Sequence, residues 1–344
     1  MSEDRSLPAY GWRPRDYQEG VWDYLKPVPG ERDPSRHAEL IWHRRAGKDE
    51  ICLHHAACSM MEKSATYWHM LPKANQVRKA IWEAVNPRTG RRRVEEAFPP
   101  WAFTYRDTDM LVRCKANAST WQCLGSDNYE GAIGSPPLGI TYSEWALANP
   151  SVRGYLRPII AENHGYQVFI TTPRGKNHAH STFRAAQKNK KQFSQLLTIE
   201  DTGVLKAEAL LEELIEYGAT YGETQGLALF QQEYYCSFDA AILGAYYGEQ
   251  FRNMEAQGRI TLVPHDPNYP VHVAMDIGYD DDMAMWWFQV IGNEVRILEC
   301  YSDSGMDVDW YCSVLTGRDI KINFIHDRLE VEYGDSNDFS FRQA

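Results

Sequence analysis

The residues 43–50, with the sequence His-Arg-Arg-Ala-Gly-Lys-Asp-Glu, constrain this chain more than any other stretch. They follow an apolar run, 38–42, that predicts a short buried strand. They open the segment 49–62, whose dense apolar residues predict a buried helix. A strand, a tight Gly-Lys turn and a helix form a phosphate-binding loop, in which N–H groups at the helix start face phosphate and the lysine adds positive charge. We therefore expect Gly47 and Lys48 to bind the phosphates of a nucleotide.

Both this loop and the strand predicted over residues 138–144 depart from the usual sequence pattern of a nucleotide-binding site. Trp42 stands where the first glycine is usually found, and Asp49 replaces the Ser or Thr that normally contacts magnesium. The strand predicted over residues 138–144 ends in Ser143 and Glu144, where Asp usually precedes the catalytic acid. We expect Glu144 to act on an attacking water and Asp49 to supply the metal-side carboxylate that Ser143 lacks. A carboxylate beside the terminal phosphate is repelled by about 4 kcal/mol at roughly 4 Å, so this role of Asp49 implies Mg²⁺ between them.

Two further places bring polar groups to the expected nucleotide site. Tyr17 and Gln18 precede the loop, and the Gln18 amide offers one donor and one acceptor to an adenine edge; the alternative is the start of a surface helix. The strand predicted over residues 166–172 ends in two threonines and is followed by a basic turn, 173–177. These groups form either a sensor of the terminal phosphate or an ordinary strand-to-helix connection.

Composition restricts the partners. The 344 residues predict two domains, and 43% hydrophobic residues supply apolar side chains for two cores. The net charge of −11 argues against a surface covered in DNA-binding charge, so a nucleic acid must meet a local basic groove. The dense basic cluster at Arg88 and residues 91–93 is a solvated loop, a DNA contact or a source of arginine for a neighbouring subunit's nucleotide. Seven cysteines without a Cys-x-x-Cys pair, no signal peptide and no membrane-spanning run predict an intracellular location.

Prolines at 264, 267 and 270 mark a change of character, and we expect a domain boundary there. Strands, then a helix and a last strand, are predicted over residues 271–278, 283–291, 294–301, 306–315 and 322–327. Asp276 and Asp327 end the first and last strands, as in an RNase H-like nuclease, whose carboxylates hold two divalent ions. The alternative is that each caps a strand. We also expect Trp286, Trp287 and Phe288 on an exposed face of this sheet.

In this order the motifs resemble the large terminase subunit of tailed bacteriophages, the ATPase–nuclease that packages viral DNA. The matching segments are residues 17–18, 43–49, 125–128, 142–147, 171–177, 275–278 and 326–327. The resemblance implies Glu144, Lys48, Arg44 and Arg45 as catalytic residues, with either arginine as a charge sensor. The implied nucleotide-binding residues are Tyr17, Gln18, Gly47, Lys48, Asp49, Thr171, Thr172 and Asn177. The implied metal ligands are Asp49, Asp276 and Asp327.

The resemblance also implies the architecture and the partners. We expect an α/β chain: a P-loop NTPase domain with a mainly parallel sheet (1–200), a helical bridging segment (201–264) and an incomplete RNase H-like nuclease domain (265–344). The implied cofactors are ATP and Mg²⁺, with Mn²⁺ or Mg²⁺ at the nuclease site. The implied partners are double-stranded DNA, the portal protein of the procapsid, the small terminase subunit and further copies in a ring on the portal. No membrane is implied, and the expected location is the cytoplasm of the bacterial host.

The chain departs from the family in ways that affect these expectations. Residues 127–135 contain no arginine, although many relatives carry one there. The chain ends at Ala344, soon after Asp327 and before the third acid of the family's nuclease, so we expect a truncated terminase with little endonuclease activity. Two other readings stay open at this stage: a helicase-like DNA translocase, and a non-catalytic assembly subunit that only binds nucleotide.

Overall fold

The computed structural model describes residues 5–26, 35–127, 136–239, 248–276, 283–303 and 305–316. Contacts divide the chain into two units, Met1–Gly248 and Glu249–Ala344. The segment 201–264, which the sequence predicts to be a helical bridge, is therefore shared between them. Among the described residues, no helix has the length and apolar content needed to cross a bilayer.

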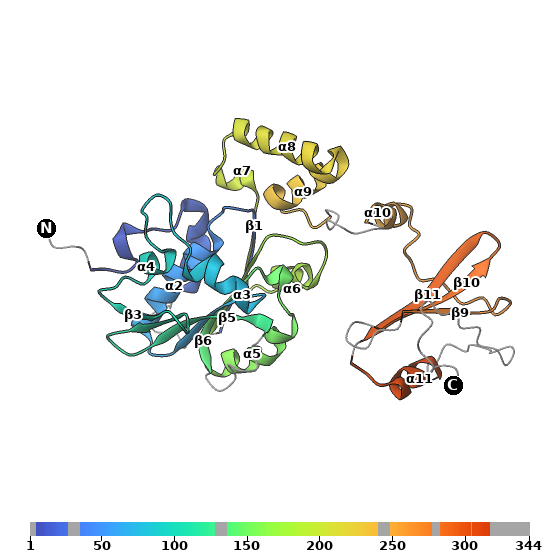
Figure 1. Ribbon diagram of the computed structural model, residues 1–344, viewed down its shortest axis with the longest axis horizontal. Helices are drawn as coiled ribbons and strands as arrows, with labels where there is room; N and C mark the ends of the chain where they lie inside the picture. Colours follow the sequence, from blue (N-terminus) through green and yellow to red (C-terminus); the bar gives the residue numbers. More distant parts are fainter. Residues whose placement is uncertain are drawn as a thin grey trace. The chain divides into compact units, whose positions relative to one another are not determined.

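The first unit is built on an eight-stranded sheet with the strand order β3-β4-β5-β2-β6-β7-β1-β8 (Figure 1). Its strands are β1 Arg36–Trp42, β2 Thr66–Leu71, β3 Phe103–Arg106, β4 Leu111–Cys114, β5 Thr120–Gly125, β6 Pro137–Ser143, β7 Tyr166–Thr171 and β8 Phe193–Leu197. All neighbours from β5 to β8 pair in parallel, whereas β3, β4 and β5 pair antiparallel. The expectation of an α/β fold with a mainly parallel sheet is confirmed.

Helices cover both faces of this sheet. The helices of the first unit are α1 Glu19–Leu25, α2 Lys48–Glu62, α3 Ala74–Val77, the π-helical turn η3 Arg78–Trp82, α4 Arg93–Ala97, α5 Ser151–Glu162, α6 His178–Lys188, α7 Ile199–Thr202, α8 Ala207–Tyr221 and α9 Glu223–Tyr235. Alternate residues of a strand point to opposite faces. Thus Tyr67 and Leu71 of β2 pack in one apolar cluster with α2, and Trp68 and Met70 pack in another with α5. Helices α8 and α9 pack against each other, with α7 beside them (Figure 1).

The strand order decides where the site lies. Strands β6, β7 and β1 are neighbours in the sheet and run in the same direction. Their carboxyl ends, at Ser143, Thr171 and Trp42, therefore meet at one edge, which is where α/β sheets bind ligands. The residues at and after these three ends include Lys48, Glu144 and Thr172, to which the sequence assigns nucleotide-binding or catalytic roles.

The second unit contains an antiparallel sheet in the order β11-β10-β9. Its elements are α10 Gly248–Ala256, β9 His272–Asp276, β10 Met283–Ile291, β11 Glu294–Asp303 and α11 Val308–Thr316. The expectation that Trp287 lies on an exposed face is wrong: Trp287 is 1% exposed and clusters with Met285 and Tyr311, whereas Trp286 is 41% exposed. Adjacent strand residues face opposite ways, so the two tryptophans cannot share a face. The strand predicted over residues 322–327 lies outside the described residues.

Candidate nucleotide-binding site

The loop between β1 and α2 has the backbone that the sequence predicts for a phosphate-binding loop. Gly47 is the residue before α2 and has a left-handed φ of 78°, which glycine adopts without steric cost. A Cβ at this position would lie 3.0 Å from Nε2 of Gln18 and 3.2 Å from a guanidinium nitrogen of Arg15. Helix α2 then begins at Lys48, so its first N–H groups, which have no partner within the helix, stand at the loop.

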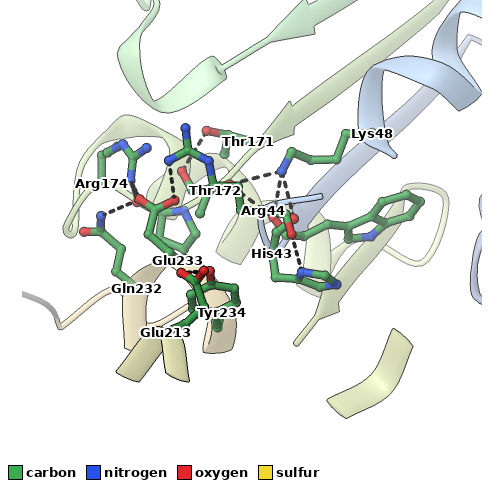
Figure 2. Close-up of polar contacts among 12 residues, drawn as sticks. His43, Arg44, Lys48, Thr171, Thr172, Arg174, Glu213, Gln232, Glu233 and Tyr234 are labelled. Carbon is green, nitrogen blue, oxygen red and sulfur yellow. Dashed lines mark hydrogen bonds and ion pairs between the residues drawn. The ribbon is translucent and has the colours of Figure 1, made fainter. Parts of the chain in front are cut away.

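Lys48 is held by three oxygen acceptors (Figure 2). Its Nζ donates to the carbonyl oxygens of Trp42 at 2.9 Å and His43 at 3.1 Å, and to Oγ1 of Thr172 at 3.0 Å. Lys48 is 8% exposed. Burial lowers the pKa of Lys48, and the negative charges of Glu144 and Asp49 act in the opposite direction. These acceptors hold the ammonium group of Lys48 between the ends of β1 and β7.

Asp49 and Ser143 form a pair that joins the loop to β6. The Ser143 hydroxyl donates to Oδ1 of Asp49 at 2.7 Å, and Nε2 of His69 lies 3.1 Å from the same oxygen. Burial raises the pKa of Asp49, but the hydrogen bonds from His69 and Ser143 and the charge of Lys48 outweigh it, so the pKa is lower than usual. Asp49 is therefore ionised at neutral pH.

This pair exchanges the usual positions of a hydroxyl and a carboxylate. In a standard site the loop contributes the hydroxyl and the strand the carboxylate; here Asp49 is on the loop and Ser143 on the strand. The described residues contain no cluster of three His, Cys, Asp or Glu side chains suited to a metal. Mg²⁺ at a nucleotide needs only one or two carboxylates beside phosphates and water. One carboxylate from Asp49 and one hydroxyl from Ser143 therefore fit Mg²⁺ and would hold it beside a phosphate.

Glu144 follows β6 in a left-handed conformation, with a φ of 52°. Its Oε2 is buried and has no hydrogen-bond partner among the described residues. Burial raises the pKa of Glu144; the charges of Lys48 and Arg174 lower it, and those of Asp49 and Glu233 raise it. Buried carboxylate oxygens normally have a partner. An unpaired acceptor near Lys48 is suited to orienting a water for attack on phosphate.

The turn after Glu144, η5 (Trp145–Leu147), is fixed by the end of β7 and the start of α6. Ala146 N–H donates to Oγ1 of Thr171 at 3.2 Å, and its carbonyl accepts from Nδ2 of Asn177 at 2.8 Å. Asn177 also caps α6 through Ala179 N–H at 3.0 Å. Thr171 and Asn177 thus contact the segment that carries Glu144, while Thr172 contacts Lys48. Whether all three also contact nucleotide stays a prediction.

Tyr17 and Gln18 support the loop from outside. Gln18 is 1% exposed; its Nε2 donates to the Ala46 carbonyl at 3.0 Å, and its Oε1 accepts from Arg15 N–H at 3.0 Å. The Tyr17 hydroxyl donates to the same Ala46 carbonyl at 3.2 Å. Both the NH₂ group and the oxygen of the Gln18 amide therefore form hydrogen bonds within the chain. A contact with adenine would require these hydrogen bonds to break.

The two arginines of the loop differ in their surroundings. Arg44 lies 3.4 Å from Oε2 of Glu233, a residue of α9 (Figure 2). Arg45 is exposed, has a left-handed φ of 73°, and forms no side-chain hydrogen bond or ion pair with the residues that the structure describes. Glu233 could not be predicted as a site residue from the sequence, because one glutamate in a helix rich in polar residues carries no local signal.

Of the two expected nuclease ligands, Asp276 and Asp327, the structure describes only Asp276, and another acid, Asp303, lies at the same end of the sheet. Asp276 lies opposite Ala284, and Asp303 lies opposite Met283, so the two acids share one end of the sheet but lie on opposite faces. Asp327 lies outside the described residues. The RNase H-like site therefore stays a prediction.

The loop and the sheet together define the class of the first unit. The glycine–lysine loop lies between β1 and α2, and an acid ends a strand two places away in the same parallel sheet. The first unit has the fold of a P-loop NTPase domain.

No family model and no curated protein matches the chain. Solved structures of large terminases, the family that the sequence motifs resemble, are similar to it. The large terminase ATPase domain of Thermus phage P74-26 is 16% identical with a TM-score of 0.49, covering 66% of this chain and 99% of that one. The large terminase of a thermophilic bacteriophage is 15% identical with a TM-score of 0.48, covering 89% and 74%. Its complex with ADP gives 14% and 0.48, with the same coverage. At these identities the similarity is one of fold.

Proposed function

We propose that this chain is an ATP-hydrolysing motor subunit of the large-terminase type, which moves double-stranded viral DNA into a procapsid. The observation that carries the proposal is the juxtaposition at one sheet edge of Lys48, the Asp49–Ser143 pair and the unpaired carboxylate oxygen of Glu144. A positive charge, a pair of oxygen ligands and a water-orienting acid are the parts that phosphoryl transfer from ATP requires.

Each residue has a separate role in this proposal. Lys48 exchanges its acceptors in the loop for the phosphate oxygens and neutralises their charge. Asp49 and Ser143 would hold Mg²⁺, which would supply further positive charge at the phosphates. Glu144 orients the attacking water and accepts its proton. Thr171 and Asn177 keep Glu144 in place and connect hydrolysis to α6.

The proposed partners follow the same assignment. They are double-stranded DNA, the portal protein, the small terminase subunit and further copies of this chain in a ring, acting in the cytoplasm of the host. The endonuclease activity of the family is not part of the proposal, because Asp327, the expected partner of Asp276, lies outside the described residues.

The test is ATP turnover and DNA translocation by the chain and its variants. Lys48→Ala is expected to abolish nucleotide binding. Glu144→Ala is expected to bind nucleotide and to lose about 100-fold or more in turnover. Lys188→Ala and Glu212→Ala, which change exposed residues of α6 and α8, serve as controls. Nucleotide binding without turnover in the parent chain would identify a non-catalytic assembly subunit, and unwinding of a forked duplex would identify a helicase-like translocase.

A further inference from the structure

One carboxylate of helix α9 holds arginines from two sides of the nucleotide site (Figure 2). Oε2 of Glu233 lies 3.4 Å from a guanidinium nitrogen of Arg44, and its Oε1 accepts a hydrogen bond from Arg174. The backbone joins them as well, because Arg44 N–H donates to the Glu233 carbonyl at 3.0 Å. The Glu233 side chain is only 8% exposed. Helix α9 is therefore tied to both loops at this site through a single residue.

Both arginines belong to segments that surround Lys48. Arg44 follows His43, whose carbonyl accepts from Lys48, and Arg174 lies two residues after Thr172, whose hydroxyl accepts from Lys48. A guanidinium binds carboxylate and phosphate through the same parallel N–H donors. A phosphate that replaces the acceptors of Lys48 therefore offers Arg44 and Arg174 an alternative to Glu233.

The ion pairs of Glu233 with Arg44 and Arg174 are shielded from water on the carboxylate side, unlike ion pairs on the surface. A nearly buried carboxylate between two guanidinium groups is costly to leave unpaired. Arg44, by contrast, keeps 64% of its side chain exposed and can turn toward a new anion. The negative charge of Glu233 is also among those that raise the pKa of Glu144, so Glu233 acts electrostatically on the proposed catalytic acid.

We propose that Glu233 is a positioning residue that competes with the terminal phosphate of bound ATP for Arg44 and Arg174, so that ATP loosens helix α9 from the phosphate loop. This inference rests on the proposed function. ADP lacks the terminal phosphate and leaves the arginines with Glu233. Displacing Glu233 from the two arginines costs the phosphate free energy, so removal of this carboxylate is expected to raise the affinity for ATP.

The first experiment measures the Kd of ATPγS and of ADP, with Mg²⁺, for the full chain and for Glu233→Gln. Removal of the competing charge is expected to tighten ATPγS about tenfold and to change ADP by less than about twofold. The matched control is Glu213→Gln, because Glu213 lies on α8 and accepts from the Tyr234 hydroxyl at 2.7 Å rather than from either arginine. Its Kd values are expected to equal those of the parent. An unchanged ratio of the two Kd values in Glu233→Gln would overturn the inference.

The second experiment uses the parent chain, so it does not depend on a variant folding. Hydrogen exchange of the amides in α9, residues 223–235, is followed without nucleotide, with ADP and with ATPγS. Faster exchange with ATPγS alone is expected; equal exchange in the ADP and ATPγS states would contradict the release of α9. If the parent hydrolyses ATP but neither readout changes, only this inference fails. If the parent binds no nucleotide, the proposed function fails with it.

Discussion

The Ser143 hydroxyl donates to Oδ1 of Asp49 at 2.7 Å and so joins the end of β6 to the first turn of α2. The residues are far apart in sequence, and each departs from the usual pattern of a phosphate loop. Together the two departures compensate, because the site keeps one hydroxyl and one carboxylate and only their positions are exchanged. The low pKa of Asp49, which results from His69 and Ser143 opposing the effect of burial, keeps this carboxylate ionised.

The first prediction concerns this exchange. Asp49→Ser leaves no carboxylate beside the proposed magnesium, and Ser143→Asp places two carboxylates together, with a repulsion of about 4 kcal/mol at roughly 4 Å. Each single variant is expected to lose at least about tenfold in Mg²⁺-dependent ATP turnover. The double variant restores the standard arrangement and is expected to recover most of it. A double variant no more active than the worse single one would show that the two residues do not act as a pair.

The second prediction concerns the loss of folding stability caused by burying the charge of Glu144. Burial raises the pKa of this carboxyl, although Lys48 and Arg174 oppose the rise. A carboxyl with a raised pKa destabilises the folded chain when ionised; the cost is complete above the folded-state pKa and absent below the unfolded-state value. Glu144→Gln is therefore expected to raise the free energy of unfolding by about 1 kcal/mol in alkaline buffer and by less in acid.

Urea denaturation at several pH values measures this effect, with the exposed Glu212→Gln of α8 as the control. Glu144→Gln is expected to lose ATP turnover while gaining stability, as is common for catalytic groups held in unfavourable surroundings. A variant that is less stable than the parent at every pH would mean that the Glu144 charge has a favourable partner.

The third prediction tests the support of the turn after Glu144. Thr171→Val removes the acceptor of Ala146 N–H and the donor to the Thr172 carbonyl. A shifted Glu144 is expected to lower kcat about tenfold, with little change in nucleotide affinity, because small displacements of catalytic groups affect the chemical step. Thr104→Val, at an exposed position of β3, is the control. A rise in KM with kcat unchanged would instead make Thr171 a nucleotide contact.

The fourth prediction compares the two adjacent tryptophans of β10. Trp287→Ala is expected to destabilise the second unit by about 3–5 kcal/mol, since Trp287 is 1% exposed and packs with Tyr311. Trp286→Ala, at a 41% exposed position on the other face, is expected to cost less than about 1 kcal/mol. Hydrogen exchange of the β9–β11 amides measures both effects within the full chain. Equal losses of protection would contradict the assignment of the two faces.

Much of the fold could be predicted because its signals are local. The apolar run before the loop, the Gly-Lys turn and the apolar helix that follows are contiguous, and each reflects the period of its own element. Strand β10 lacks such a signal, because eight of its nine residues are apolar and its one strongly polar residue, Gln289, is buried. The prediction for Trp287 was wrong because it placed three adjacent residues on one face, although successive side chains of a strand point to opposite faces.

The sequence by itself determined the glycine–lysine turn at Gly47 and Lys48 and the acid at the end of β6, because the backbone conformation and charge at these places depend on neighbouring residues. Only the tertiary structure decided which groups meet them. The pairing of Asp49 with Ser143, separated by 94 positions, and of Arg44 with Glu233, separated by 189, follows from the order of strands in the sheet and the return of α9 to the loop. Such contacts have no local period, since they depend on how separate elements pack after each has formed.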